Sequence, residues 1–263
     1  MNATRETVII ESMSNPFRAF GSAVRDFFDE IVVLTVCNLI WALLCLPTWI
    51  FANFLLGEGE PLLAGLTVLA GILPTGPATA GLSFVAYRVV DGRAVKLNEY
   101  FEGMRRYART GWIMAAIWLT GFVTIIFNLN FYGGESIFSV LMVVFWFYML
   151  LFWLATLIYA PALVHLQEEP TLRVLVRNTF LMVMGRPIYT LVTLVLMGLF
   201  FGLSLVLIIV PLMLTFSFFA VWGARATKQL VDEARRRREE ATGGPTAVSE
   251  GEERGRKGQV RPK

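Results

Sequence analysis

The chain has 263 residues, of which 56% are hydrophobic and 16% charged, and its mean hydropathy is +0.62. An ordinary globular domain carries about 25% charged residues, so this composition excludes a soluble enzyme of usual make-up. Five stretches contain no Asp, Glu, Lys or Arg, and each is longer than the roughly 20 apolar residues that cross a bilayer as a helix; they are 31–57, 61–87, 110–134, 136–167 and 187–224. The sequence therefore predicts an all-α, polytopic membrane protein.

Cysteine and histidine are too scarce for metal or redox chemistry. Cys37 and Cys45 are the two cysteines and lie eight residues apart, about 12 Å along a helix, which is too far for a disulfide within that helix. His165 is the one histidine, so no histidine cluster exists for zinc or haem. No set of nucleophile, base and orienting residue can be assembled either. We expect no catalytic residues, no metal site, no cofactor and no enzyme activity.

The cationic residues predict the orientation in the membrane. Of 23 Lys and Arg residues, three precede the first apolar stretch, six lie between the second and third, three lie between the fourth and fifth, and eleven follow Gly223. The connections at 58–60 and near residue 135 contain only acidic charges. Because Lys and Arg are concentrated in cytoplasmic loops, we expect a multi-pass protein of the cell (inner or plasma) membrane with its N-terminus in the cytoplasm.

The last apolar stretch, 187–224, decides the number of spans. As one helix its 38 residues would measure about 57 Å, against a hydrocarbon core of about 30 Å. We expect two crossings that turn near Ile209–Pro211 and return the C-terminus to the cytoplasm; a kinked, re-entrant segment is the alternative, because this turn has no polar residue. The six expected spans are 31–56, 62–88, 110–132, 137–164, 188–207 and 210–226.

Each pair of spans follows a segment with apolar residues at helical spacing. These segments begin near Phe17, Leu97 and Leu172, and each pattern is typical of an amphipathic helix at the membrane surface. The chain is thus expected to contain three repeats of a surface helix followed by a transmembrane hairpin, at about 17–90, 97–166 and 172–231.

The two ends of the chain differ from the middle in composition. We expect residues 1–16 to form an N-terminal cytoplasmic segment, 17–231 the transmembrane helical domain, and 232–263 a basic, disordered cytoplasmic tail. Eleven of the cations and seven acidic residues follow Ala224, which favours a topology signal or, alternatively, attraction to anionic lipid. Nucleic-acid binding is not expected, because no aromatic residues or fold surround the basic run.

The densest motif lies in the second span. Pro74, Gly76 and Pro77 fall within four residues, so we expect them to interrupt the helix and free backbone groups that must face protein or a water-filled cavity. One interpretation is a kinked packing helix with small residues at its contacts; the other is a discontinuous helix that offers carbonyls and hydroxyls to a neutral solute. The candidate packing or solute-contact residues of this span are Pro74, Thr75, Gly76, Pro77, Thr79 and Ser83.

Four more residues complete the candidate set. Asn38 and Trp41 share one face of the first span, and a buried asparagine needs a partner on another helix, for which we expect the break in the second span. Arg88 and His165 lie at the cytoplasmic ends of spans two and four, where we expect them to contact lipid or the interface. Packing between helices is the alternative for His165.

These motifs resemble those of the YesL-like family of bacterial integral membrane proteins, whose shared domain has no known function. The resemblance covers about residues 17 to 230. Gly81 stands where the family pattern has alanine. The matching elements are Asn38-Leu39-Ile40-Trp41, Gly76-Pro77-Ala78-Thr79-Ala80 running on to Arg88, Tyr100-Phe101 to Tyr107, and Tyr159-Ala160-Pro161 leading to Arg177-Asn178 and Pro187.

The resemblance implies a multi-span protein encoded with components of carbohydrate uptake systems and glycoside hydrolases. We therefore expect a non-catalytic accessory component linked to carbohydrate uptake, with the lipid bilayer, a carbohydrate ABC transporter permease or a second copy of the chain as partners. The alternative is a stand-alone facilitator or permease for a small neutral solute, and a membrane enzyme is the least favoured interpretation.

Overall fold

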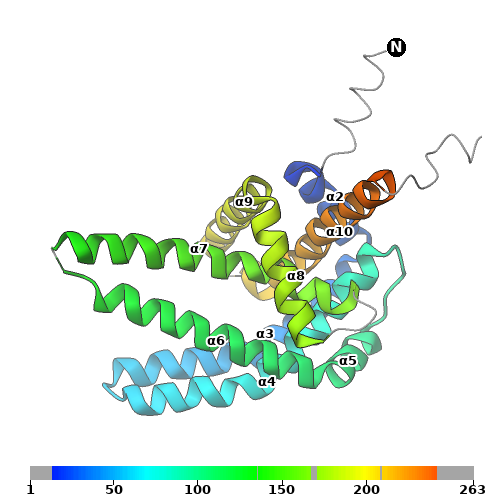
Figure 1. Ribbon diagram of the computed structural model, residues 1–263. Coiled ribbons are helices and arrows are strands. Elements are labelled where there is room, and N and C mark those ends of the chain that lie inside the picture. Colours follow the sequence, from blue (N-terminus) through cyan, green and yellow to red (C-terminus); the bar gives the residue numbers. More distant parts are fainter. Residues whose placement is uncertain (1–13, 135, 167–170, 208, 242–263) are drawn as a thin grey trace, which may run out of the picture. The chain divides into compact units, whose positions relative to one another are not determined.

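The computed structural model describes residues 14–134, 136–166, 171–207 and 209–241, and these residues form helices and no strands. Figure 1 shows their order along the chain. The helices are α2 (Pro16–Asp29), α3 (Ile31–Gly57), α4 (Pro61–Val90), α5 (Leu97–Arg106), α6 (Ala108–Phe131), α7 (Ile137–Leu166), α8 (Leu172–Gly185), α9 (Pro187–Val206), the π-helical turn η1 (Pro211–Thr215) and α10 (Phe216–Ala241).

Five helices in the described part of the chain are long and apolar enough to cross a membrane: α3, α4, α6, α7 and α9. They occupy five of the six expected ranges. The sixth, 210–226, is divided between η1 and the first part of α10, and α10 is charged from Arg225 onwards. The chain is thus all-helical, with several helices suited to a multi-pass membrane protein.

Two compact units make up the chain, and the larger one comprises Asn15–Thr227. In the described part of the smaller unit, α10 continues from Lys228 to Ala241. The disorder expected from residue 232 is therefore not found over 232–241, where the sequence also allowed the last helix to extend through 235–240. Charged residues one turn apart favour the helix there, and Arg237 donates to Glu233 at 2.7 Å. The remainder of the expected tail, and residues 1–13 of the N-terminal segment, lie outside the described residues.

Three shorter helices, α2, α5 and α8, each precede a longer apolar helix. Asn15 caps α2 by accepting from the Phe17 N–H at 2.9 Å, and Pro16 occupies the first turn, both of which favour a helix start. A single residue joins each short helix to the next long one: Glu30 before α3, Tyr107 before α6 and Arg186 before α9. The surface helices expected from the sequence thus meet their apolar neighbours without a loop.

The buried residues of each short helix lie on one face. In α2 they are four residues apart, as they are in α8, which places them on a single stripe. The buried sets are Ala19, Ala23 and Phe27 in α2, Tyr100 and Gly103 in α5, and Leu175, Thr179 and Val183 in α8.

Burial in the larger unit is concentrated at one end of the long helices. In α4 it becomes dense from Gly76 to Val90, and in α7 it runs from Ala155 to Val164. The opposite ends expose large apolar side chains such as Leu62, Phe131 and Ile137. Figure 1 shows the α3–α4 and α6–α7 hairpins projecting away from α5 and α8.

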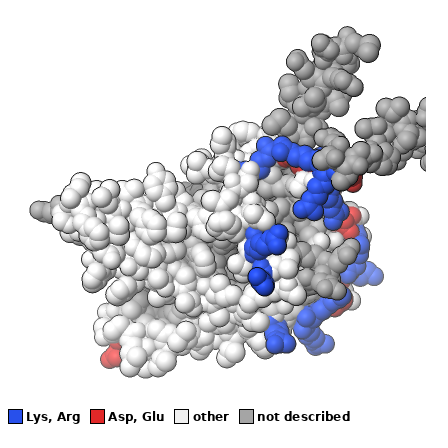
Figure 2. Space-filling view, viewed as in Figure 1, with Lys and Arg blue, Asp and Glu red and all other residues white. Residues whose placement is uncertain are grey.

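Charged residues follow the same division between the two ends of the long helices. Figure 2 shows almost no charged atoms over the projecting parts of the two hairpins, apart from acidic atoms at one tip. The α3–α4 connection at that level is Glu58-Gly59-Glu60, and its tight turn uses a positive φ of 81° at Gly59, which glycine adopts without steric cost. The apolar ends of the hairpins are therefore the surfaces suited to lipid.

Candidate functional site

The densest predicted motif lies where α4 crosses α6. A Cβ atom on Gly76 would lie 2.8 Å from Cδ1 of Trp112 and 2.9 Å from the carbonyl carbon of Gly111. A Cβ atom on Gly111 would in turn collide with the carbonyl oxygen of Gly76. The two backbones are thus in direct contact, as small residues permit at helix crossings in membranes.

Helix α4 runs without a break through Pro74 and Pro77, so the expected interruption of the second span is wrong. Pro77 has no N–H, which leaves the carbonyl of Leu73 without its helical donor. Nε1 of Trp112, on α6, donates to this carbonyl at 2.9 Å. A neighbouring helix therefore satisfies the freed group, and the helix continues.

One hydroxyl group of the motif bonds to α3. Nε1 of Trp41 donates to Oγ1 of Thr79 at 3.0 Å, and Thr75 lies one turn earlier on α4. The Trp41 ring also contacts Phe216 of α10, with 4.1 Å between centroids. The predicted residues Trp41 and Thr79 are thus brought together between helices.

Asn38 is fully buried. We expected its partner to be the break in the second span, but the structure pairs it with groups elsewhere in the chain. Its Nδ2 donates to the carbonyls of Pro211 at 3.1 Å and Leu212 at 2.6 Å, and its Oδ1 accepts from the Ser217 N–H at 2.8 Å. One side chain thus satisfies three backbone groups around η1. These partners lie more than 170 residues away in the chain, so no local pattern could have identified them.

Ser83 and His165 meet at the buried ends of α4 and α7. Their Oγ and Nε2 atoms are 3.0 Å apart, and Ser83 also donates to the Ala80 carbonyl at 3.0 Å. The contact joins α4 to α7 through two residues that lie 82 positions apart in the chain.

Aromatic rings enclose the imidazole of His165. The centroid of Tyr107 lies 4.6 Å away, that of Phe84 5.6 Å and that of Tyr87 5.8 Å. Its Nδ1 is buried and has no hydrogen-bond partner among the described residues. The structure therefore places His165 in a helix contact, which is one of the two positions, interfacial or helix-packing, expected for it from the sequence.

Arg88 contacts protein on two sides. Its Nε lies 3.4 Å from Oε2 of Glu99 on α5, and its guanidinium lies over the Phe84 ring at 5.5 Å. It thereby joins α4 to α5.

The unusual glycine at position 81 has a steric explanation. A Cβ atom there would lie 2.6 Å from Cγ of Met104 and 2.7 Å from the carbonyl oxygen of Tyr100. The glycine thus lets α5 approach α4 closely. Tyr100 itself is fully buried, and this burial raises the pKa of its phenol above the ordinary value.

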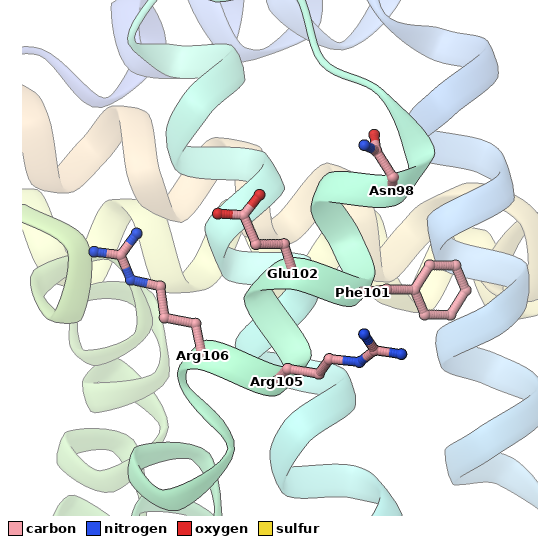
Figure 3. A pocket seen from close by; sticks show the side chains of 5 residues that line it. All are labelled: Asn98, Phe101, Glu102, Arg105 and Arg106. Atoms are coloured by element: carbon pink, nitrogen blue, oxygen red, sulfur yellow. The ribbon is translucent and has the colours of Figure 1, made fainter.

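A shallow hollow lies on the opposite, exposed face of α5. Figure 3 shows the side chains that line it: Asn98, Phe101, Glu102, Arg105 and Arg106. The sequence pattern predicts a surface helix here, and none of these residues belongs to the expected site. A pair of adjacent arginines beside an exposed aromatic residue is the signal that could have identified it.

Among the described residues, no group of three or more His, Cys, Asp or Glu side chains is placed to hold a metal ion. Comparison of the sequence with protein-family models, with curated proteins and with solved structures finds no match.

Proposed function

We propose that the chain is a multi-pass protein of the cell membrane with both termini in the cytoplasm, and that it acts as a non-catalytic accessory component linked to carbohydrate uptake. The main support for the accessory role is that the polar side chains of the apolar helices bond to other helices. Asn38, Trp41, Thr79 and Trp112 all form hydrogen bonds between helices. Their polar atoms bind protein, which supports a role in assembly rather than solute binding.

The exposed apolar surface supports a partner within the membrane. The most apolar 18-residue window of α7 has no buried residue, and its exposed side chains include Leu141, Val144 and Phe145. Lipid alone can cover such a surface, but a helix of another membrane protein can pack there as well. The link to carbohydrate uptake comes from the resemblance to the YesL-like family.

The proposed threading places α3, α4, α6 and α7 across the bilayer. Asn38 is the eighth residue of α3 and contacts Pro211 and Leu212, so η1 lies about 10 Å along α3 from its first residue. With a cytoplasmic N-terminus, this depth favours the re-entrant alternative for the last apolar stretch. Six full crossings and a re-entrant segment both leave the C-terminus in the cytoplasm.

Affinity purification of the full chain in mild detergent tests the accessory role. We expect a carbohydrate permease or its solute-binding protein to copurify, and Val144→Trp on α7 to reduce the recovery. Ile50→Trp on the exposed part of α3 is the matched control. Repeated recovery of the chain alone would contradict the proposal.

Reconstituted vesicles separate this role from that of a solute facilitator. We expect a panel of sugars and polyols to enter vesicles containing the protein no faster than empty vesicles. Flux above background that Thr79→Val abolishes would establish a facilitator instead.

A further inference from the structure

We propose that the exposed face of α5 binds headgroups of an anionic phospholipid in the cytoplasmic leaflet, and that Arg105 and Arg106 each contact a headgroup phosphate. The site is the hollow of Figure 3. The inference rests on the membrane location in the proposed function and goes beyond it by naming a ligand and the residues that bind it.

The position of α5 is fixed at the start of a transmembrane helix. It ends at Arg106, and α6 begins two residues later at Ala108. Its inner face packs closely on α4, because a Cβ atom on Gly103 would lie 2.8 Å from Cβ of Phe84. The ends of apolar helices lie at the level of the headgroups, so α5 lies there and presents its other face outward.

Two guanidinium groups are available on that face. Arg105 is exposed and forms no ion pair within the described part of the chain, while Arg106 lies over the Tyr107 ring at 5.5 Å. Figure 3 shows the two side chains extending to opposite sides of the helix. A guanidinium binds phosphate oxygens through two parallel hydrogen bonds, so the pair can hold the phosphates of two neighbouring headgroups, one on each side of the helix.

The remaining residues of the hollow favour a lipid over a free phosphate ion. Phe101 is 43% exposed, and Leu97, one turn earlier, is 37% exposed; this apolar pair suits the glycerol and upper acyl region. Glu102 and Asn98 add acceptors beside the guanidinium groups, which suit headgroup hydroxyls. A phosphodiester with a hydroxylated headgroup, as in phosphatidylglycerol, matches all these groups.

The test measures lipid binding by the full chain in vesicles of phosphatidylcholine that contain a minor fraction of phosphatidylglycerol. Lipid retained after mild extraction is quantified by native mass spectrometry. We expect the double variant Arg105→Gln/Arg106→Gln to bind phosphatidylglycerol roughly tenfold more weakly, which corresponds to about 1.4 kcal/mol. The control, Arg93→Gln/Arg173→Gln, removes two exposed cations outside the hollow and should bind as the wild type does.

Further measurements identify the ligand and distinguish this proposal from the proposed function. Phe101→Ser should weaken lipid binding, and inorganic phosphate should not displace the lipid. Equal loss in both double variants, no loss in either, or displacement by phosphate would overturn the headgroup site. If the wild-type protein inserts into the membrane but does not prefer the anionic lipid, the headgroup site alone is overturned. If the protein does not partition into the membrane, the proposed function is overturned as well.

Discussion

Nε1 of Trp112 on α6 lies 2.9 Å from the carbonyl oxygen of Leu73 on α4, the acceptor that Pro77 leaves without a helical donor. This hydrogen bond joins two helices at the point where their backbones touch. It also explains how α4 continues past Pro77, since a hydrogen bond from outside the helix replaces the one that Pro77 cannot make.

The first prediction concerns this donor. Trp112→Phe leaves the Leu73 carbonyl unpaired in an apolar environment, so we expect a loss of about 1–3 kcal/mol in stability, measured as thermal unfolding in detergent. Pro77→Ala restores an N–H at position 77 and should recover part of the loss in the Trp112→Phe background. Trp49→Phe, at an exposed position on α3, is the control, and an equal loss there would contradict the assignment.

The second prediction concerns the contact between the two backbones. Gly111→Ala places a methyl group against the Gly76 carbonyl, and we expect the α4–α6 contact to open with a loss of about 1–3 kcal/mol, typical of overpacking. Gly65→Ala, on the same helix as Gly76, meets no atom within 4 Å and should leave the melting temperature unchanged or raise it slightly. The same destabilisation in both variants would show that the loss of stability comes from introducing alanine into a helix, rather than from the contact between α4 and α6.

The third prediction concerns Asn38. Asn38→Leu removes the partners of two carbonyls and one N–H around η1, so we expect destabilisation of about 1–3 kcal/mol and faster proteolysis near residue 211. Asn53→Leu is the matched control, because the Asn53 side chain is bonded only to Trp49 of its own helix in the described structure. Unchanged proteolysis of Asn38→Leu would show that the asparagine does not hold η1.

How far the sequence anticipates this structure depends on the range of each interaction. The ends of α3 and α7 are predictable to within two residues, because charged or turn residues bound each apolar stretch and hydrocarbon cannot accommodate them. The partners of Asn38 and Leu73 were not predictable, because they depend on which helices cross and at which residue. Ser83 and His165 appeared separately in the sequence analysis, and only the packing of α4 against α7 brings them together.

The fourth prediction concerns the depth of the turn after α9. A single cysteine at Ile209, in a chain whose buried Cys37 and Cys45 are replaced by alanine, should not react with an impermeant thiol reagent added to intact cells. The reason is that η1 contacts the first third of α3, and this part of α3 lies on the cytoplasmic side of the bilayer in the proposed threading. A cysteine at the exposed Glu60, in the α3–α4 connection, is the positive control. Labelling at position 209 from outside would establish six full crossings.

The one-residue joints Glu30, Tyr107 and Arg186 have a mechanical consequence. Each peptide unit is rigid, so a joint of one residue offers only two soft torsions. The direction of α5 relative to α6 is therefore set by the φ and ψ of Tyr107, which are −108° and 13°, and the close packing of α5 on α4 holds that direction.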